Sequence, residues 1–156
     1  GSAVRRRGSF VNWGDAMSAR PLSVVIAAAL GLAVGAATAA TKEQLQVGKQ
    51  EYLAKCAACH GASGKGDGPQ AASLKQKPSD LTTYAKRNGG KLPEKQAWAL
   101  IDGRQLDDRV QQDRAMPVWG HTLKTQARAD ERKDVEPYVR ARIAAVLEYL
   151  KTLQVK

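Results

Sequence analysis

Three residues whose types and spacing could do chemistry lie together in the sequence KCAACHGASGKGDGP, residues 55–69. Cys56 and Cys59 are separated by two residues, and His60 follows directly. Three kinds of site use such residues: a redox-active dithiol, a structural zinc site, and the covalent attachment site of a haem. In the third, the two thiols bond to the vinyl groups of one porphyrin edge, and the histidine ligates the iron.

The surrounding sequence favours haem attachment. A thioredoxin-type dithiol normally lies in a βαβ pattern, and no strand-like alternation surrounds Cys56. Zinc needs four ligands, and the fourth would have to be His121, at a spacing unlike that of zinc fingers. CxxCH is the attachment pattern of c-type haem. We therefore predict one covalent haem c, with Cys56 and Cys59 as thioether residues and His60 as the proximal iron ligand.

The other axial ligand can be sought by elimination. Of the two methionines, Met17 lies in the N-terminal leader, which leaves Met116 in the sequence RAMPVWG. Pro117 restrains the backbone beside it, and Trp119 offers an aromatic wall for a bound haem. We expect Met116 to be the distal ligand, with His121 as its main competitor. The alternative is a methionine that only fills the core.

Helical patterns flank these residues, and no strand pattern is found. Thr41 and Gln44 match a capping box that opens a helix running up to Cys56. A second helix is predicted over 93–102, and a third from Pro137 onward. The apolar stripe of this last helix consists of Val139, Ile143, Val146, Leu150 and Leu153.

Two segments are predicted to be irregular. Residues 61–83 are rich in glycine and proline, and lack the spacing of a phosphate-binding loop. We interpret them as tight backbone around the edge of a flat macrocycle. Residues 121–135 are polar and charged, and we predict a solvated loop or the frayed start of a helix there.

The first 40 residues have the pattern of an export signal or other N-terminal extension. Residues 21–41 carry no charge, basic residues precede them, and Ala37-Thr38-Ala39 is a small-residue cleavage pattern. An uncleaved membrane anchor is the alternative, because about 20 apolar residues can span a bilayer. We thus expect a leader over 1–40, a single domain over 41–156, and a periplasmic location.

The composition of residues 41–156 limits the possible partners. They hold 21 Lys and Arg against 14 Asp and Glu, which favours acidic partners. Nucleic acid is not expected, because the domain is exported and has no basic run. Its aromatic residues are Trp98, Trp119 and four tyrosines, so the core is thin and a prosthetic group would supply apolar bulk.

The chain resembles the bacterial class I, mono-haem cytochromes c over about residues 41–156. The resemblance is carried by four motifs: Cys56-Ala57-Ala58-Cys59-His60-Gly61, Gly66-Asp67-Gly68-Pro69, Pro78-Ser79-Asp80-Leu81-Thr82 and Met116-Pro117-Val118-Trp119-Gly120. Many relatives are shorter in the segment 121–135.

This resemblance implies an all-α cytochrome c fold wrapped around one covalently attached haem. It implies that the first and last helices cross, with Gly48 and Tyr52 meeting Val146 and Tyr149. It also implies that the carbonyl of Pro69 accepts a hydrogen bond from the ring of His60, and that Met116 is the distal ligand.

A haem with ligands on both faces has no open position for a substrate, so we expect one-electron transfer and no enzyme activity of its own. The expected role is a carrier between a respiratory dehydrogenase or reductase and a terminal oxidase or reductase. The alternative is a haem c subunit of a larger periplasmic or membrane-bound oxidoreductase. An enzyme or gas sensor with a labile Met116 is a third class.

We also expect redox protein partners with acidic docking patches, and contact with a membrane only through an uncleaved leader or a membrane complex. A basic rim around the haem edge would steer them. Its candidates are Lys55, Lys65, Lys75, Lys77, Lys86 and Arg87.

Overall fold

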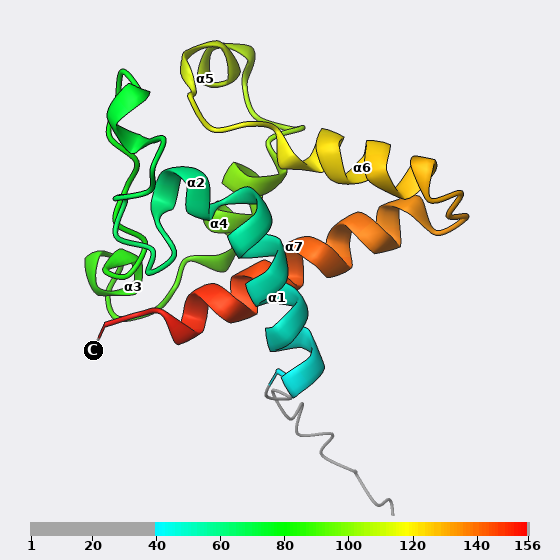
Figure 1. Ribbon diagram of the computed structural model, residues 1–156, viewed down its shortest axis with the longest axis horizontal. Helices are drawn as coiled ribbons and strands as arrows, with labels where there is room; N and C mark the ends of the chain where they lie inside the picture. The colour runs from blue at the N-terminus through cyan, green and yellow to red at the C-terminus, as the bar shows by residue number, and fades with distance from the viewer. Residues whose placement is uncertain (1–39, 156) are drawn as a thin grey trace, which may run out of the picture. The chain divides into compact units, whose positions relative to one another are not determined.

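The fold consists of helices joined by irregular segments, with no strand among the residues that the computed structural model describes, 40–155. Side chains of residues 111–113 are not described, and the predicted leader lies outside this range apart from residue 40. The elements are α1 (Lys42–Lys55), α2 (Ala57–His60), the 3-10 turn η1 (Ala71–Ser73), α3 (Tyr84–Arg87), α4 (Glu94–Asp102), α5 (Asp108–Asp113), α6 (Trp119–Ala129) and α7 (Val135–Thr152) (Figure 1).

The first helix begins at the predicted capping box. The Gln44 backbone N–H donates to Thr41 Oγ1 over 3.2 Å, and the Thr41 backbone N–H donates to Gln44 Oε1 over 3.0 Å. Two of the N–H groups that lack intrahelical partners are thereby satisfied. α1 ends at Lys55, so it delivers Cys56 directly to the turn that opens α2.

α1 and α7 cross and pack against each other, as expected (Figure 1). Gly48 lies at the crossing, where an added Cβ would collide with the carbonyl group of Ala145. Tyr52 is fully buried one turn later, and its ring centroid lies 5.4 Å from that of Tyr149. The glycine is therefore required for the close approach of the two backbones.

The core is built mainly on α7. Val139, Ile143, Val146 and Leu150 of the predicted stripe are buried, and Leu153 packs against them. The helix starts at Val135, two residues before the predicted position, so Pro137 lies within its first turn, where a missing N–H costs nothing. The remaining core residues are Tyr52, Ala97, Ile101, Leu123 and Leu147.

The prediction of a solvated loop or a frayed helix start over 121–135 is wrong for most of its length, because the segment holds a regular helix with a buried face. Residues 119–129 form α6, whose Gly120, Leu123 and Ala127 are buried. Their spacing of three and four places them on one face, which packs on α7. Polar neighbours conceal this narrow stripe in the sequence. Within this segment, the longest continuous exposed stretch is residues 128–134.

The C-terminus is tied to the segment around α3. Gln154 donates through Nε2 to the Leu81 carbonyl over 2.9 Å and accepts from the Ala85 N–H over 2.8 Å. By contrast, the turn after α3 is open: Gly89 and Gly90 are exposed, and nothing lies within 4 Å of where their Cβ atoms would be.

Among residues 40–155, we find no helix with the length and apolar character needed to cross a bilayer.

Candidate functional site

A cavity of about 610 Å³ lies at the predicted site. Its lining includes Cys56, Cys59, His60, Met116 and Trp119. Sites for small molecules and cofactors usually have ~300–1,000 Å³. A single cavity therefore brings together five of the residues that the sequence singled out. We call residues 56–70 the proximal segment and residues 114–118 the distal segment.

Main-chain hydrogen bonds hold the proximal segment. The His60 N–H donates to the Cys56 carbonyl over 2.8 Å, which forms the single turn of α2. The glycine-rich loop then folds back over it: the Gly66 N–H donates to the His60 carbonyl over 2.8 Å, and the Gly68 N–H donates to the Cys59 carbonyl over 3.1 Å. The motif residues are thus fixed by the backbone itself.

The glycines of this loop have a conformational role, as predicted. Gly61, Gly64 and Gly66 have φ values of 77°, 83° and 75°, a region that residues with a Cβ rarely enter. A side chain of α1 also stabilises the loop: the buried hydroxyl of Tyr52 donates to the Gly61 carbonyl over 2.7 Å.

The carbonyl that contacts the His60 ring is that of Ser79, 3.1 Å from Nδ1. Pro69, expected in this role, is exposed and is not among the residues that line the cavity. The loop brings residues 78 and 79 back beside Gly66, where a Cβ would meet the Pro78 carbonyl. Ser79 lies in one of the quoted motifs, but its sequence gave no reason to prefer its carbonyl.

Cys56 does not have the property of a reactive dithiol. No disulfide joins it to Cys59, and burial raises the pKa of the Cys56 thiol to about 12. Catalytic dithiols instead have a lowered pKa that favours the reactive thiolate. Nor do the described residues contain a cluster of three His, Cys, Asp or Glu side chains that could hold a metal ion such as zinc.

The distal segment connects α5 to α6. Met116 is half-buried in it and lines the cavity, and Trp119, the first residue of α6, is a second part of the lining. His121 is exposed one residue after Gly120 and is not part of the lining. Met116, and not its competitor, thus lines the same cavity as the residues of the CxxCH motif.

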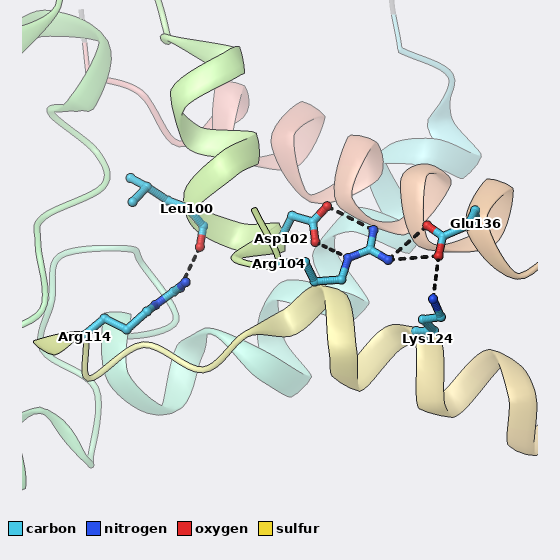
Figure 2. A network of polar contacts seen from close by, with 6 residues as sticks. All are labelled: Leu100, Asp102, Arg104, Arg114, Lys124 and Glu136. Atoms are coloured by element: carbon cyan, nitrogen blue, oxygen red, sulfur yellow. Dashed lines mark hydrogen bonds and ion pairs between the residues drawn. The ribbon is translucent and has the colours of Figure 1, made fainter. Parts of the chain in front are cut away.

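Sequence reasoning missed Arg114, which also lines the cavity. Its Nη2 donates to the Leu100 carbonyl over 2.7 Å and to the Pro117 carbonyl over 3.2 Å. Figure 2 shows the guanidinium directed at the last turn of α4. Burial lowers the pKa of Arg114. The only signal in the sequence was a cation two residues before the candidate ligand.

A second arginine network joins α4, α6 and α7 (Figure 2). Arg104 pairs with Asp102 and reaches both carboxylate oxygens of Glu136 at 3.0 Å. Lys124 of α6 pairs with Glu136 over 3.2 Å. The hydrogen bond from Arg104 is the main cause that lowers the pKa of Asp102. The network therefore ties the middle of α6 to the end of α4 and to the first turn of α7.

The candidate basic rim is only partly at the cavity. Lys55, Lys77 and Arg87 line it, whereas the other three are exposed outside the lining: Lys65, Lys75 and Lys86.

Comparison with known proteins gave one match. The family model described as Cytochrome c matches residues 45–154, from α1 to the end of α7. No curated protein and no solved structure matches the chain.

Proposed function

The chain belongs to the cytochrome c family, and from this premise we propose that it carries single electrons through a haem c whose iron is ligated by His60 and Met116. Covalent haem c and electron transfer are properties of the family, and Cys56 and Cys59 supply its CxxCH attachment pattern. When bound, haem c supplies an iron that changes between the ferric and ferrous states.

The observation that carries the proposal is the shared cavity. His60 and Met116 come from segments more than 50 residues apart in the chain, yet both line it. The Ser79 carbonyl holds the His60 ring through Nδ1, which leaves Nε2 as the nitrogen able to ligate. Ligation by a methionine thioether together with a histidine imidazole would raise the potential of the haem iron. Two protein ligands would also leave no position for oxygen or peroxide.

The proposed setting is the periplasm, where the protein would shuttle between a respiratory dehydrogenase or reductase and a terminal oxidase or reductase. Its partners would carry acidic patches, because Lys77 and Arg87 are exposed at the cavity. A haem c subunit of a larger periplasmic or membrane-bound oxidoreductase is the second candidate. The α6–α7 hairpin supports it, since residues 128–134 are exposed and could dock on another subunit.

Carbon monoxide binding tests the ligand assignment. Reduced wild-type haem protein is expected to resist carbon monoxide, whereas Met116→Ala is expected to bind it readily and to lose the Met–iron charge-transfer absorption. The matched control is His121→Ala, which should behave as wild type. If His121→Ala binds carbon monoxide and Met116→Ala does not, His121 is the ligand and the assignment is wrong.

Fractionation of cells from the source organism separates the two settings. A native gel stained for haem peroxidase activity is expected to show a soluble periplasmic band near the mass of residues 41–156. A membrane band of much larger mass would instead support the subunit.

A further inference from the structure

Arg114 bridges two carbonyl groups that come from different parts of the chain. One belongs to Pro117, directly after Met116, and the other to Leu100 in the last turn of α4. The side chain thus closes a short ring across Met116 and anchors that ring to a helix. Among the described residues, no other hydrogen bond involves a group of residues 114–117.

A guanidinium suits this position for two reasons. It presents several N–H donors in a fixed plane, so one group can serve two carbonyls. The carbonyls in the last turn of a helix lack intrahelical partners and lie at the negative end of its dipole, which favours a cation there. Leu100 is two residues from the end of α4 at Asp102.

The guanidinium is also closely enclosed. Gly103, with a φ of 71°, ends α4, and a Cβ there would collide with Arg114 Nη1. Nη1 itself is buried and has no hydrogen-bond partner among the described residues. Burying a cation without an acidic partner is unfavourable. Among the described residues the guanidinium has no carboxylate partner, so what it provides there is a tie between two backbones.

Arg104 shows what a pairing arginine looks like in the same region. It contacts the carboxylates of Asp102 and Glu136, as Figure 2 shows. Within the described part of the chain it forms no hydrogen bond or ion pair with the distal segment. Both arginines are partly buried and both touch the C-terminal end of α4. They differ in that, among these two, Arg114 is the one that donates a hydrogen bond to the loop that carries Met116.

We propose that Arg114 is a positioning residue for Met116, holding the distal segment against α4 so that the thioether stays available to the iron. The inference depends on the proposed ligation by Met116. It goes beyond that ligation because it makes the stability of the Met–iron bond depend on Arg114, a side chain that does not ligate the iron.

The test compares Arg114→Gln, Arg114→Lys and the matched control Arg104→Gln as haem-loaded proteins. Two readouts are needed: the Met–iron charge-transfer absorption of the oxidised protein and carbon monoxide binding to the reduced one. Haem content and the helical circular dichroism signal confirm that each variant is folded. Met116→Ala provides the spectrum of a protein without its thioether ligand.

For Arg114→Gln we expect weaker Met–iron absorption and an apparent carbon monoxide affinity about ten- to a hundredfold above wild type, the effect of losing one or two charge-assisted hydrogen bonds. Arg114→Lys retains the charge and one reachable carbonyl, and should be intermediate. Arg104→Gln should lower thermal stability and leave both readouts at the wild-type level.

Three results would overturn the inference. Wild-type readouts in folded Arg114→Gln would show that Met116 needs no such tie. Equal changes in Arg104→Gln would show that general loosening of α6, and not the contact of Arg114, is responsible. If Met116→Ala leaves the wild-type spectrum unchanged, the proposed ligation has failed, and the inference with it; this outcome is recognised before any arginine variant is compared.

Discussion

The proximal and distal segments contribute to one cavity but are held in different ways. In the proximal segment, N–H groups of Gly66 and Gly68 bond to the carbonyls of His60 and Cys59, so the main chain fixes its own shape. In the distal segment, the guanidinium of Arg114 supplies the hydrogen bonds that reach α4 and Pro117.

This difference separates what a substitution can change on each side. A main-chain framework is insensitive to most side-chain changes and vulnerable where glycine is required. Where side chains supply the hydrogen bonds, single substitutions can remove those bonds one at a time. Proximal changes should therefore affect whether haem is bound and the protein folds, and distal changes should affect how the iron is ligated.

The largest expected effect is the loss of covalent haem in the double variant Cys56→Ala/Cys59→Ala. Without thioethers, essentially all haem should extract into acidified organic solvent, measured by absorption of both phases. Each single variant keeps one thioether and should retain haem on a denaturing gel. Met116→Ala should retain it fully, since the distal side makes no covalent bond. Haem retained by the double variant would contradict the attachment site.

Gly66→Ala tests the backbone framework of the proximal segment. With a φ of 75° and the Pro78 carbonyl in the way, the added methyl group should lower the free energy of unfolding by about 3 kcal/mol. Denaturant titration of the haem-loaded protein measures it. Gly89→Ala is the control: its φ is 71° but nothing lies within 4 Å. Equal losses would mean that the close approach to residue 78 is unimportant.

Asp102→Asn tests the side-chain framework beside the distal segment. Loss of its charge-assisted contact with Arg104 should cost about 2 kcal/mol at pH 7. The folded-state pKa of Asp102 is lowered, so its contribution is present above its unfolded pKa of about 3.9 and disappears as pH falls through the folded value. Wild type and variant should therefore converge in acid.

Unfolding curves at pH 7 and near pH 3 measure this convergence. Asp134→Asn is the control, because its ion pair with Arg132 is exposed and contributes little. A constant difference between Asp102→Asn and wild type at both pH values would exclude the ionised carboxylate as its cause.

The smallest effect is expected for Tyr52→Phe, which removes the hydroxyl that donates to the Gly61 carbonyl. Leaving that carbonyl without its partner should cost about 1 kcal/mol, with the haem spectrum unchanged. Tyr149→Phe, on the partner ring of the same aromatic pair, should cost less. If both variants match wild type, the brace from α1 to the proximal segment carries no stability.

Local sequence was sufficient to predict the tight, glycine-rich backbone of the proximal segment and both terminal helices. CxxCH, the glycines with positive φ and the capping box at Thr41 each encode their geometry within a few residues. The crossing at Gly48 was implied by family resemblance, and the structure agrees with it. The apolar stripe of α7 was clear because its residues are large and regularly spaced.

Features that depend on tertiary contacts could not be predicted. The buried face of α6 is only Gly120, Leu123 and Ala127, too few apolar atoms to stand out among charged neighbours. Whether the carbonyl of Ser79 or that of Pro69 contacts the His60 ring depends on how residues 78 and 79 fold back beside Gly66. No local sequence pattern encodes this. Likewise, Arg114 gains its contacts from the end of α4, which the sequence could not place beside it.

The open turn at Gly89 and Gly90 has a consequence for the continuity of the chain. A single proteolytic cut there would divide the domain into one piece with α1, α2 and both cysteines, and another with α4 to α7. The α1–α7 crossing and the Gln154 ties to Leu81 and Ala85 would still join the pieces. A nicked protein should therefore remain a non-covalent two-chain complex that keeps its haem, and come apart only in denaturant.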